Sequence, residues 1–209
     1  MARYLGPSCR ICRRQGQKLF LKGTKCLTEK CPFQRRGYPP GQHGQSRMKK
    51  QSDYGRQLQE KQKVKRIYGV LERQFRKTFD QASRARGVTG EKLLELLERR
   101  LDNVIFRLGF ATSRSQARQI VRHRHVLAGE RKVNVPSFIV RPGISLRLVG
   151  SEKFLSQIRE TRELTKERPL PAWLDRHPED PAGSVVGLPK REDVQFPIQE
   201  SLIVELYSK

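Results

Sequence analysis

The four cysteines, which are the only ones in the chain, have the spacing of a metal site. Two residues separate Cys9 from Cys12, four separate Cys26 from Cys31, and thirteen residues join the two pairs. Two residues between thiolates let one tight turn direct both sulfur atoms at a single ion, and the longer loop brings the second pair to complete a tetrahedron. We predict a structural four-cysteine metal knot that holds zinc. Four thiolates suit an iron–sulfur cluster equally well on ligand type, and free thiols or two disulfides are the remaining interpretations.

A row of arginines is the second pattern that could do chemistry. Arg114, Arg118 and Arg122 recur every four residues in a predicted helix, so they would share one face opposite its apolar positions. Ser113 and Gln116 match a capping box that would start this helix. Like charges at this spacing repel each other, and a polyanion lying against the row would relieve that repulsion. We expect that replacing the three arginines together by alanine weakens binding to that polyanion without unfolding the domain.

An extended basic arm follows the cysteines. The segment PPGQHG at 39–44 is rich in proline and glycine, which disfavours a regular helix. A disordered linker is one interpretation. We favour an arm that becomes ordered on RNA, with aromatic rings for stacking and cations for phosphates. The stacking candidates are Tyr38 and His43, and the phosphate-binding candidates are Arg35, Arg36, Arg47, Lys49 and Lys50.

The charge of the chain indicates the class of its partner. A net charge of +23 and a pI of about 10.6 point to a polyanion, either nucleic acid or an anionic membrane surface. Residues 1–50 carry 13 Lys and Arg against one acid and residues 99–150 carry 11 against 2, whereas residues 151–209 carry 9 against 11. We see no apolar run long enough to span a membrane and no signal peptide. A cytosolic protein is therefore expected, in which structural disulfides are rare.

Helices are expected to position these groups in the first half of the chain. A helix over 53–67, capped by Ser52, should turn several cations outward. A second helix over 71–86 carries Phe75 and Phe79 at core spacing. A third helix should start at Thr89 and run on through Leu108, so that one helix would link two modules. The cations expected to point outward from the first helix are Lys61, Lys63, Lys65 and Arg66.

Short strands and further helices are expected in the second half. The runs HVLA, RKVNV and SLRLV within 125–149 alternate in polarity and are separated by hairpin turns. A helix over 152–167 should bury Phe154, Leu155, Ile158 and Leu164, and Trp173 should anchor packing. The tail from 199 could be a helix, which its polar start favours, or a strand, which its β-branched residues favour.

Several long segments resemble one known family. They are ARYLGP at 2–7, the four cysteines, PPGQHG at 39–44, SDYGRQLQEKQKVKRIYGVLERQFR at 52–76, LLERRLDNVIFRLGFATSRSQARQIVRH at 96–123, VPSFIVRPG at 135–143 and LIVELYS at 202–208. Runs of this length are highly specific. Along nearly its whole length the chain resembles the bacterial small-subunit ribosomal proteins of the uS4 family.

The resemblance implies an α+β fold. A mainly helical domain would contain an inserted RNA-binding module, made of a helix-turn-helix-like pair and a small antiparallel sheet, beside the N-terminal metal knot. The domains would be residues 1–50 for the knot and the basic arm, 51–98 for the helical domain, completed by about 190–209, 99–161 for the module, and 162–189 for strands and loops that pack on it. This arrangement favours a helix for 200–207.

The resemblance also implies a function. The protein would be a primary binder of 16S rRNA that nucleates the body of the small (30S) subunit in the cytoplasm. It would contact ribosomal protein S5, an interface linked to translational accuracy. Arg47, Lys49 and Lys50 would lie at the mRNA entry channel. The expected rRNA-binding residues are Arg3, Arg10, Arg13, Arg14, Arg35, Arg36, Tyr38, His43, Lys61, Lys65, Arg66, Arg73, Arg114, Arg118, Arg122, His123 and Arg131.

Two features depart from the usual family pattern. Gly129-Glu130 replaces an Asn-Gly hairpin turn, and because glycine comes first we expect a type II′ turn. Ile144 stands where the family usually has an acid, which weakens any contact inferred for that position. The cysteine set is not universal in the family, so the metal prediction rests on this sequence alone.

Two other functions compete with the ribosomal one. The same RNA-binding module occurs in RNA-modifying enzymes, but no segment here could form a separate catalytic domain. Asp102, the most tempting carboxylate, is better explained as an ion-pair partner of the arginines around it. A zinc-knot DNA-binding regulator is the other alternative. We expect no enzymatic activity, no small-molecule substrate and no membrane partner.

Overall fold

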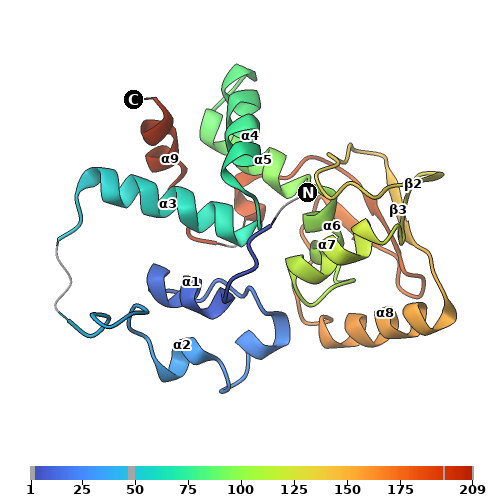
Figure 1. Ribbon diagram of the computed structural model, residues 1–209. Helices are drawn as coiled ribbons and strands as arrows, with labels where there is room; N and C mark the ends of the chain where they lie inside the picture. Colours follow the sequence, from blue (N-terminus) through green and yellow to red (C-terminus); the bar gives the residue numbers. More distant parts are fainter. Residues whose placement is uncertain (1–2, 47–49, 195, 209) are drawn as a thin grey trace. The chain divides into compact units, whose positions relative to one another are not determined.

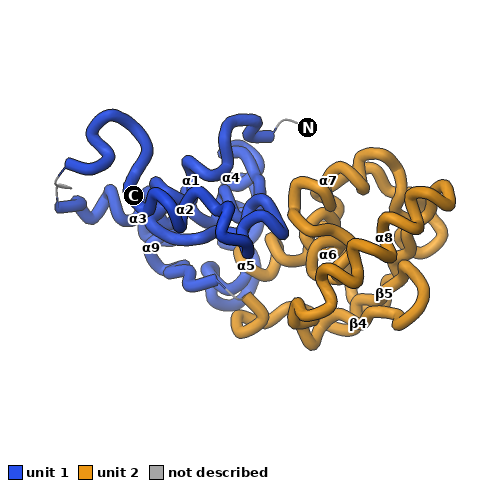
Figure 2. The backbone as a smooth tube through the Cα atoms, turned by 90° about the horizontal axis from the view of Figure 1, so that it is seen from below, with its two compact units in different colours: residues 1–92, 196–209 blue, residues 93–195 orange. Residues whose placement is uncertain are grey.

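The computed structural model describes residues 3–46, 50–194 and 196–208, and the chain divides into two compact units. Unit 1 comprises residues 1–92 and 196–209, and unit 2 comprises residues 93–195, as Figure 2 shows by colour. Helix α5 (Thr89–Glu98) contains the boundary between them. The last helix of the chain therefore belongs to the same unit as its first helices.

The regular structure described in unit 1 is helical (Figure 1). Its elements are α1 (Ser8–Gln15), η1 (Gly23–Cys26), α2 (Pro32–Arg35), α3 (Asp53–Ile67), α4 (Glu72–Arg84), the start of α5, and α9 (Glu200–Tyr207). Helix α3 begins as predicted, because the Ser52 hydroxyl accepts a hydrogen bond from the Gly55 backbone N–H at 3.2 Å.

The tail is a helix, which resolves the choice left open by the sequence. Helix α9 packs against α3. Its Tyr207 ring also stacks on Phe79, with the ring centroids 4.4 Å apart, and lies 6.3 Å from Phe75. Phe75 and Phe79 are buried, so the prediction that they form core rather than stacking platforms for bases is confirmed.

Unit 2 combines helices with one antiparallel sheet. Its elements are the end of α5, α6 (Leu101–Arg107), α7 (Arg114–Arg122), β1 (Val126–Ala128), β2 (Arg131–Lys132), β3 (Ser145–Leu148), α8 (Glu152–Leu164), β4 (Leu174–Arg176), β5 (Ala182–Val185) and η2 (Arg191–Asp193). The strand order is β2-β1-β3-β5-β4. The predicted combination of helices with a small antiparallel sheet is confirmed.

One hydrophobic core joins the helices of unit 2 to one face of the sheet. Leu146 and Leu148 of β3 are buried in it, while Arg147 between them points to solvent. Helices α6, α7 and α8 contribute to the same cluster, and the predicted anchor Trp173 is buried in it with 3% of its surface exposed. The helix-turn-helix-like pair is therefore fixed to the sheet by apolar packing.

The hairpin between β1 and β2 has the predicted turn. Ala128 pairs with Arg131, so Gly129 and Glu130 are the two loop residues. Gly129 has a φ of 60°, and Glu130 is not among the residues with positive φ. A positive φ at the first loop residue alone is the pattern of a type II′ turn.

The prediction of one continuous helix from Thr89 to Leu108 is wrong. Helix α5 ends at Glu98, and α6 starts at Leu101. The backbone groups between them pair with segment 136–140 instead: the Leu101 N–H donates to the Phe138 carbonyl at 2.8 Å, and the Val140 N–H donates to the Arg99 carbonyl at 2.9 Å. These long-range hydrogen bonds replace two helical ones, so tertiary structure overrides the apolar periodicity.

A second correction concerns α8. The sequence predicts Leu164 on its buried side, but 67% of the residue is exposed, whereas Ile158 is buried. Leu164 lies six residues after Ile158, which is more than one and a half helical turns, so the two side chains point to different sides. Helix α8 also ends at Leu164 rather than at residue 167.

Candidate RNA-binding surface

The four cysteines do not form a metal-binding cluster as they are placed. Among the residues that the structure describes, no three His, Cys, Asp or Glu side chains are gathered in a group that could hold a metal ion. Cys12, Cys26 and Cys31 are buried, and Cys9 is half-buried. The predicted four-cysteine knot is therefore not supported by these positions.

Without a bound cation, the surroundings of Cys12 favour the neutral thiol over the thiolate. Burial raises the pKa of Cys12, and the nearby charges of Cys26, Cys9 and Cys31 raise it further. The Lys22 backbone N–H donates to the Cys26 sulfur at 3.3 Å. The Cys12 sulfur is thus close enough to the other cysteines for their charges to raise its pKa, and a bound cation would oppose this repulsion.

The N-terminal part of unit 1 presents most of its predicted cations to solvent. Among these residues Arg3, Arg10, Arg14, Arg35, Arg36, His43 and Lys50 are exposed. Arg13 differs from them. Its Nε donates to the Tyr38 carbonyl at 2.9 Å, and its guanidinium lies 5.0 Å from the centroid of the Tyr38 ring. Arg13 therefore fastens the basic arm to α1. Arg47 and Lys49 lie outside the described residues.

The outward row of lysines predicted on α3 is wrong at two positions. Lys63 and Lys65 are buried, with 5% and 8% of each residue exposed. Lys63 donates to the Glu60 carboxylate at 2.5 Å and to the Pro197 carbonyl at 2.8 Å. The sequence pattern missed this because the faces of α3 that carry them are covered by other parts of unit 1, which bring acceptors to the lysines.

Three side chains converge on Glu72. Lys65 and Lys61 donate to its carboxylate at 2.7 and 2.9 Å, and the Tyr207 hydroxyl donates at 2.9 Å. Burial opposes ionisation of Glu72, but these hydrogen bonds outweigh it and lower its pKa to about 2. Burial, and then the hydrogen bond to Glu72, raise the pKa of Tyr207. Lys61 and Lys65 are thus held by a carboxylate. Of the other cations predicted here, Arg73 is exposed and Arg66 stacks on the Tyr4 ring at 4.3 Å.

The predicted arginine row on α7 is wrong in the middle. Arg122 is exposed, but only 6% of Arg118 is, and its NH1 lies 3.3 Å from the Asp102 carboxylate. Arg100, also buried, forms a two-pronged contact with the same carboxylate at 2.7 and 3.1 Å. Asp102 is an ion-pair partner, as predicted. A rotation of about 40° for every four residues carries the row across the helix surface, so its members do not share one environment.

Arg114 is positioned by its neighbours in unit 2. Its Nε donates to the Asn103 side-chain oxygen at 2.8 Å. Its guanidinium lies 4.4 Å from the centroid of the Phe106 ring, and the Arg168 guanidinium lies 4.1 Å from the same centroid. Such cation–π contacts fix the orientation of the side chain. Arg114 is therefore half-buried and preorganised, in contrast to Arg122.

The sequence did not predict the interactions of two further buried or half-buried arginines, Arg107 and Arg168. Glu98 is fully buried and pairs with Arg107 through contacts of 2.9 and 3.0 Å. Arg168 donates to the carbonyls of Phe106 and Ala111. Burial, and then the nearby Arg107 charge, lower the pKa of Arg168 to about 10. The only signal in the sequence was the scarcity of acids among these arginines, which makes each acid a candidate for burial.

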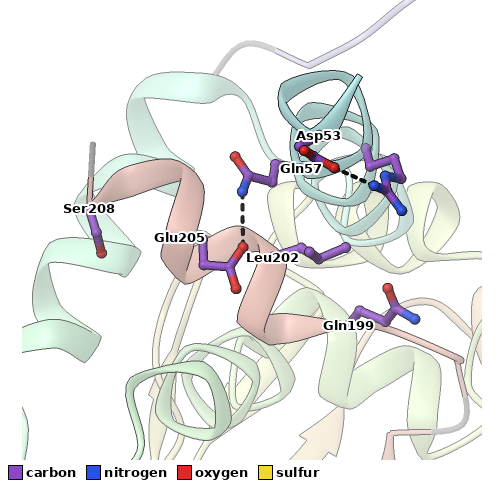
Figure 3. A pocket seen from close by; sticks show the side chains of 7 residues that line it. Asp53, Gln57, Gln199, Leu202, Glu205 and Ser208 are labelled. Atoms are coloured by element: carbon purple, nitrogen blue, oxygen red, sulfur yellow. Dashed lines mark hydrogen bonds and ion pairs between the residues drawn. The ribbon is translucent and has the colours of Figure 1, made fainter. Parts of the chain in front are cut away.

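A groove in unit 1 has a different chemistry from the basic surface. It lies between α3 and α9, has a volume of about 640 Å³ and is lined by Asp53, Arg56, Gln57, Gln199, Leu202, Glu205 and Ser208. Figure 3 shows Gln57 and Glu205 facing each other across it, joined by a hydrogen bond of 2.9 Å. Its carboxylates disfavour contact with a phosphate backbone, so we interpret it as a surface for a partner other than RNA.

The remaining predicted contacts lie in unit 2. His123 and Arg131 are exposed, at the end of α7 and in the edge strand β2. None of the helices in the described part of the chain has both the length and the apolar character that a bilayer crossing requires. Apart from Arg73 on α4, the predicted contacts that are exposed lie in the N-terminal part of unit 1 and in the α7–β2 region of unit 2.

Comparison with known families finds two that match this chain. The family described as ribosomal protein S4/S9 N-terminal domain matches residues 3–98, and the S4 domain matches residues 99–143. Together these matches cover well over half of the chain. The chain therefore belongs to the uS4 family of ribosomal proteins, which confirms the resemblance seen in the sequence.

Relatives extend this similarity to the full length. The small ribosomal subunit protein uS4 of Thermodesulfovibrio yellowstonii is 58% identical over 209 residues, covering 100% of both chains. The proteins of the same name from Thermoanaerobacter sp. strain X514 and Geobacter sp. strain M21 are 56% and 58% identical over the same length.

Proposed function

We propose that the protein is a structural component of the small (30S) ribosomal subunit in the cytoplasm, where it binds rRNA and catalyses no reaction. The observation that carries this proposal is the similarity of the whole chain to small ribosomal subunit proteins. The net charge of +23 and the exposed arginines of both units support it, because neutralising phosphates is the dominant source of affinity for RNA.

The mechanism follows from the kinds of side chain that are exposed. Arginines in two separate regions can neutralise phosphates of one folded RNA, so that recognition depends mainly on the shape of the RNA. Tyr38 and His43 add rings that can stack on unpaired bases. The protein would thus act as a primary binder of 16S rRNA, and by gripping one fold of it would nucleate assembly of the subunit body.

The test is binding of the purified full-length chain to a 16S rRNA transcript in the absence of other ribosomal proteins. We expect tight binding. The logarithm of the association constant should fall steeply as the logarithm of the salt concentration rises. Binding that needs another ribosomal protein would contradict the primary role. Preference for duplex DNA over structured rRNA would favour a DNA-binding regulator, and altered nucleosides after incubation with RNA would favour a modifying enzyme.

We assign the groove between α3 and α9 to a protein partner. Asp53 pairs with Arg56 within the groove, and the exposed carboxylate of Glu205 leaves the lining with a net negative charge in a chain of high positive charge, which suits a basic polypeptide. The family resemblance suggests ribosomal protein S5, an interface tied to translational accuracy. Replacing Asp53 by Asn and Glu205 by Gln should weaken binding of purified S5 without weakening rRNA binding. Equal S5 binding by the variant would remove this assignment.

We propose that Arg47, Lys49 and Lys50 contact mRNA at the entry channel of the ribosome. Only Lys50 belongs to the described residues, and it is exposed. Replacing all three by alanine should slow the passage of structured mRNA through reconstituted ribosomes, since fewer cations would contact the message. Unchanged passage would contradict the proposal.

We also propose that the cysteines bind structural zinc. Their spacing, the burial of three of them and the hydrogen bond from the Lys22 N–H to the Cys26 sulfur support this. Zinc would supply folding energy that such a small knot cannot gain by burial. Elemental analysis should find zinc, and the protein should be colourless. Iron with visible absorption bands would indicate an iron–sulfur cluster instead, and the absence of both from freshly purified protein would contradict a metal site.

A further inference from the structure

A small pocket lies between the end of α7 and the start of α8, outside the arginine row. Its volume is about 220 Å³, below the range of roughly 300–1,000 Å³ typical of drug-sized ligands. Ile120 and Ile158 form a buried apolar floor. Polar side chains that are exposed, namely Gln119, His123 and Gln157, form the rim. This combination suits one planar ring with hydrogen-bonding edges.

One wall of the pocket is a fixed aromatic stack. The His125 ring lies on the Phe154 ring with centroids 4.1 Å apart and planes 19° from parallel. The His125 Nδ1 is 3.0 Å from the Val149 carbonyl oxygen, and this contact fixes the orientation of the imidazole ring. Gly150 makes room for this arrangement, since a Cβ there would lie 2.7 Å from Phe154 Cδ1 and 3.1 Å from His125 Nδ1.

The backbone that presents the two histidines is unusual. Arg124, which lies between them in sequence, has a φ of 62°. Residues other than glycine rarely adopt this left-handed backbone conformation. Strained backbone of this kind is concentrated at functional sites. Here it closes the end of α7 and places the His123 ring 6.2 Å from the His125 ring. Both rings therefore belong to one preformed site.

The charges next to the pocket suit a nucleotide in RNA. Arg122, Arg124 and Lys153 are exposed and adjoin the lining residues in sequence, so they can neutralise the phosphates on either side of a base. Glutamine amides can hydrogen-bond to the edge of a base, and imidazole rings stack on its face. A base held in a duplex could not enter, because its faces and pairing edge are occupied.

We propose that this pocket binds one unpaired nucleobase of the RNA, with His123 stacking on it and the Gln119 and Gln157 amides contacting its edge. This inference rests on the proposed rRNA-binding function and adds to it a site that reads a base rather than the backbone. It also gives the α7 region a specificity that phosphate contacts alone would lack.

The first test compares full-length variants for affinity to a 16S rRNA transcript at several salt concentrations. His123→Ala combined with Gln157→Ala, and separately Gly150→Ala, should each weaken binding roughly tenfold, as expected when one base no longer stacks, without changing the salt slope. Ser156→Ala and Gly187→Ala are matched controls, since Ser156 is an exposed neighbour on α8 and nothing lies within 4 Å of a Cβ at Gly187. The thermal unfolding transition of each variant should be measured to check that the variant is folded.

The outcomes separate this inference from the proposed function. If wild-type protein binds rRNA but the pocket variants bind equally well, the pocket assignment is wrong and the ribosomal function stands. A reduced affinity accompanied by a smaller salt slope would also overturn the assignment, because it would indicate that the replaced side chains neutralise a phosphate. If wild-type protein does not bind rRNA at all, the proposed function fails first.

A second measurement observes the pocket directly. Imidazole resonances of His123 and His125 in the full-length protein should shift on addition of a single-stranded pentaribonucleotide mixture, and should not shift with an RNA duplex. Equal shifts with the duplex, or none with either, would contradict a base pocket. Nucleoside monophosphates that bind as tightly as the oligonucleotides would identify a free nucleotide as the occupant, and would overturn the assignment to RNA.

Discussion

Arginines of the α6–α7 region and arginines of the N-terminal segment have the same charge and opposite surroundings. Arg100, Arg107 and Arg118 are buried and paired with carboxylates, whereas Arg10 and Arg14 are exposed. The difference lies in the few acids: Glu98 and Asp102 are both buried among arginines. A count of cations therefore indicates a polyanionic partner, but the positions of the acids decide which cations are free to meet it.

The largest expected effect comes from breaking the most buried pair. Replacing Glu98 by alanine leaves Arg107 buried without its carboxylate, which should destabilise the protein by about 3–5 kcal/mol. Chemical denaturation of the variant and the wild type measures this. Glu130→Ala is the control, because Glu130 is exposed and its removal should change the free energy of unfolding by less than about 0.5 kcal/mol. Similar stabilities for the two variants would contradict a structural role for the pair.

The N-terminal arginines should show the reverse behaviour. Replacing Arg10, Arg14 and Arg36 together by alanine should weaken 16S rRNA binding roughly 100-fold at physiological salt and reduce the salt slope by about 3, one for each phosphate that is no longer neutralised. Stability should hardly change, since all three are exposed. Filter binding across a salt series measures the slope. As a control, Lys166→Ala, in the acidic last quarter of the chain, should leave the salt slope unchanged. An unaltered slope in the triple variant would show that these arginines do not contact RNA.

The same comparison can be made within helix α7. Arg118→Ala should destabilise the protein by about 2 kcal/mol, because Asp102 loses one of its two arginine partners in a buried site. Arg122→Ala should leave stability within about 0.5 kcal/mol of wild type and reduce the salt slope of rRNA binding by about 1. Removal of all three arginines together should therefore destabilise the fold, because Arg118 pairs with the buried Asp102. Thermal unfolding and rRNA binding of the two single variants test this division, which would be lost if their effects were alike.

Local signals in the sequence predicted much of the fold. The Ser52 cap, the glycine that begins the 129–130 turn and the core spacing of Phe75 and Phe79 all act over a few residues, so the sequence contains what they require. The family was predictable because long segments match it. The break between α5 and α6 was not predictable, because it depends on hydrogen bonds to segment 136–140, which is distant in sequence.

The site was predictable only in outline. The sequence identifies cations, but the burial of Lys65 and Arg118 depends on which carboxylate the fold brings to each. The stack of His125 on Phe154 likewise joins residues from α8 and the turn after α7, with Gly150 as the only local hint. Hydrophobic periodicity shows which side of a helix is apolar, but it does not show which distant residues will pair with a given side chain.

The smallest expected effect concerns Glu72, whose carboxylate accepts hydrogen bonds from Lys61 and Lys65. Its pKa is about 2 in the folded protein and near 4.5 when unfolded, so its stabilising contribution is complete above pH 4.5 and is lost as the pH falls towards 2. The side chain is 46% exposed, and solvent screening reduces this contribution to roughly 1 kcal/mol. Glu72→Gln should therefore lower stability at pH 7 by about that amount and flatten the loss of stability between pH 5 and pH 3. Urea denaturation at each pH measures both. Parallel pH profiles for the variant and the wild type would mean that the carboxylate does not hold the two lysines in the folded protein.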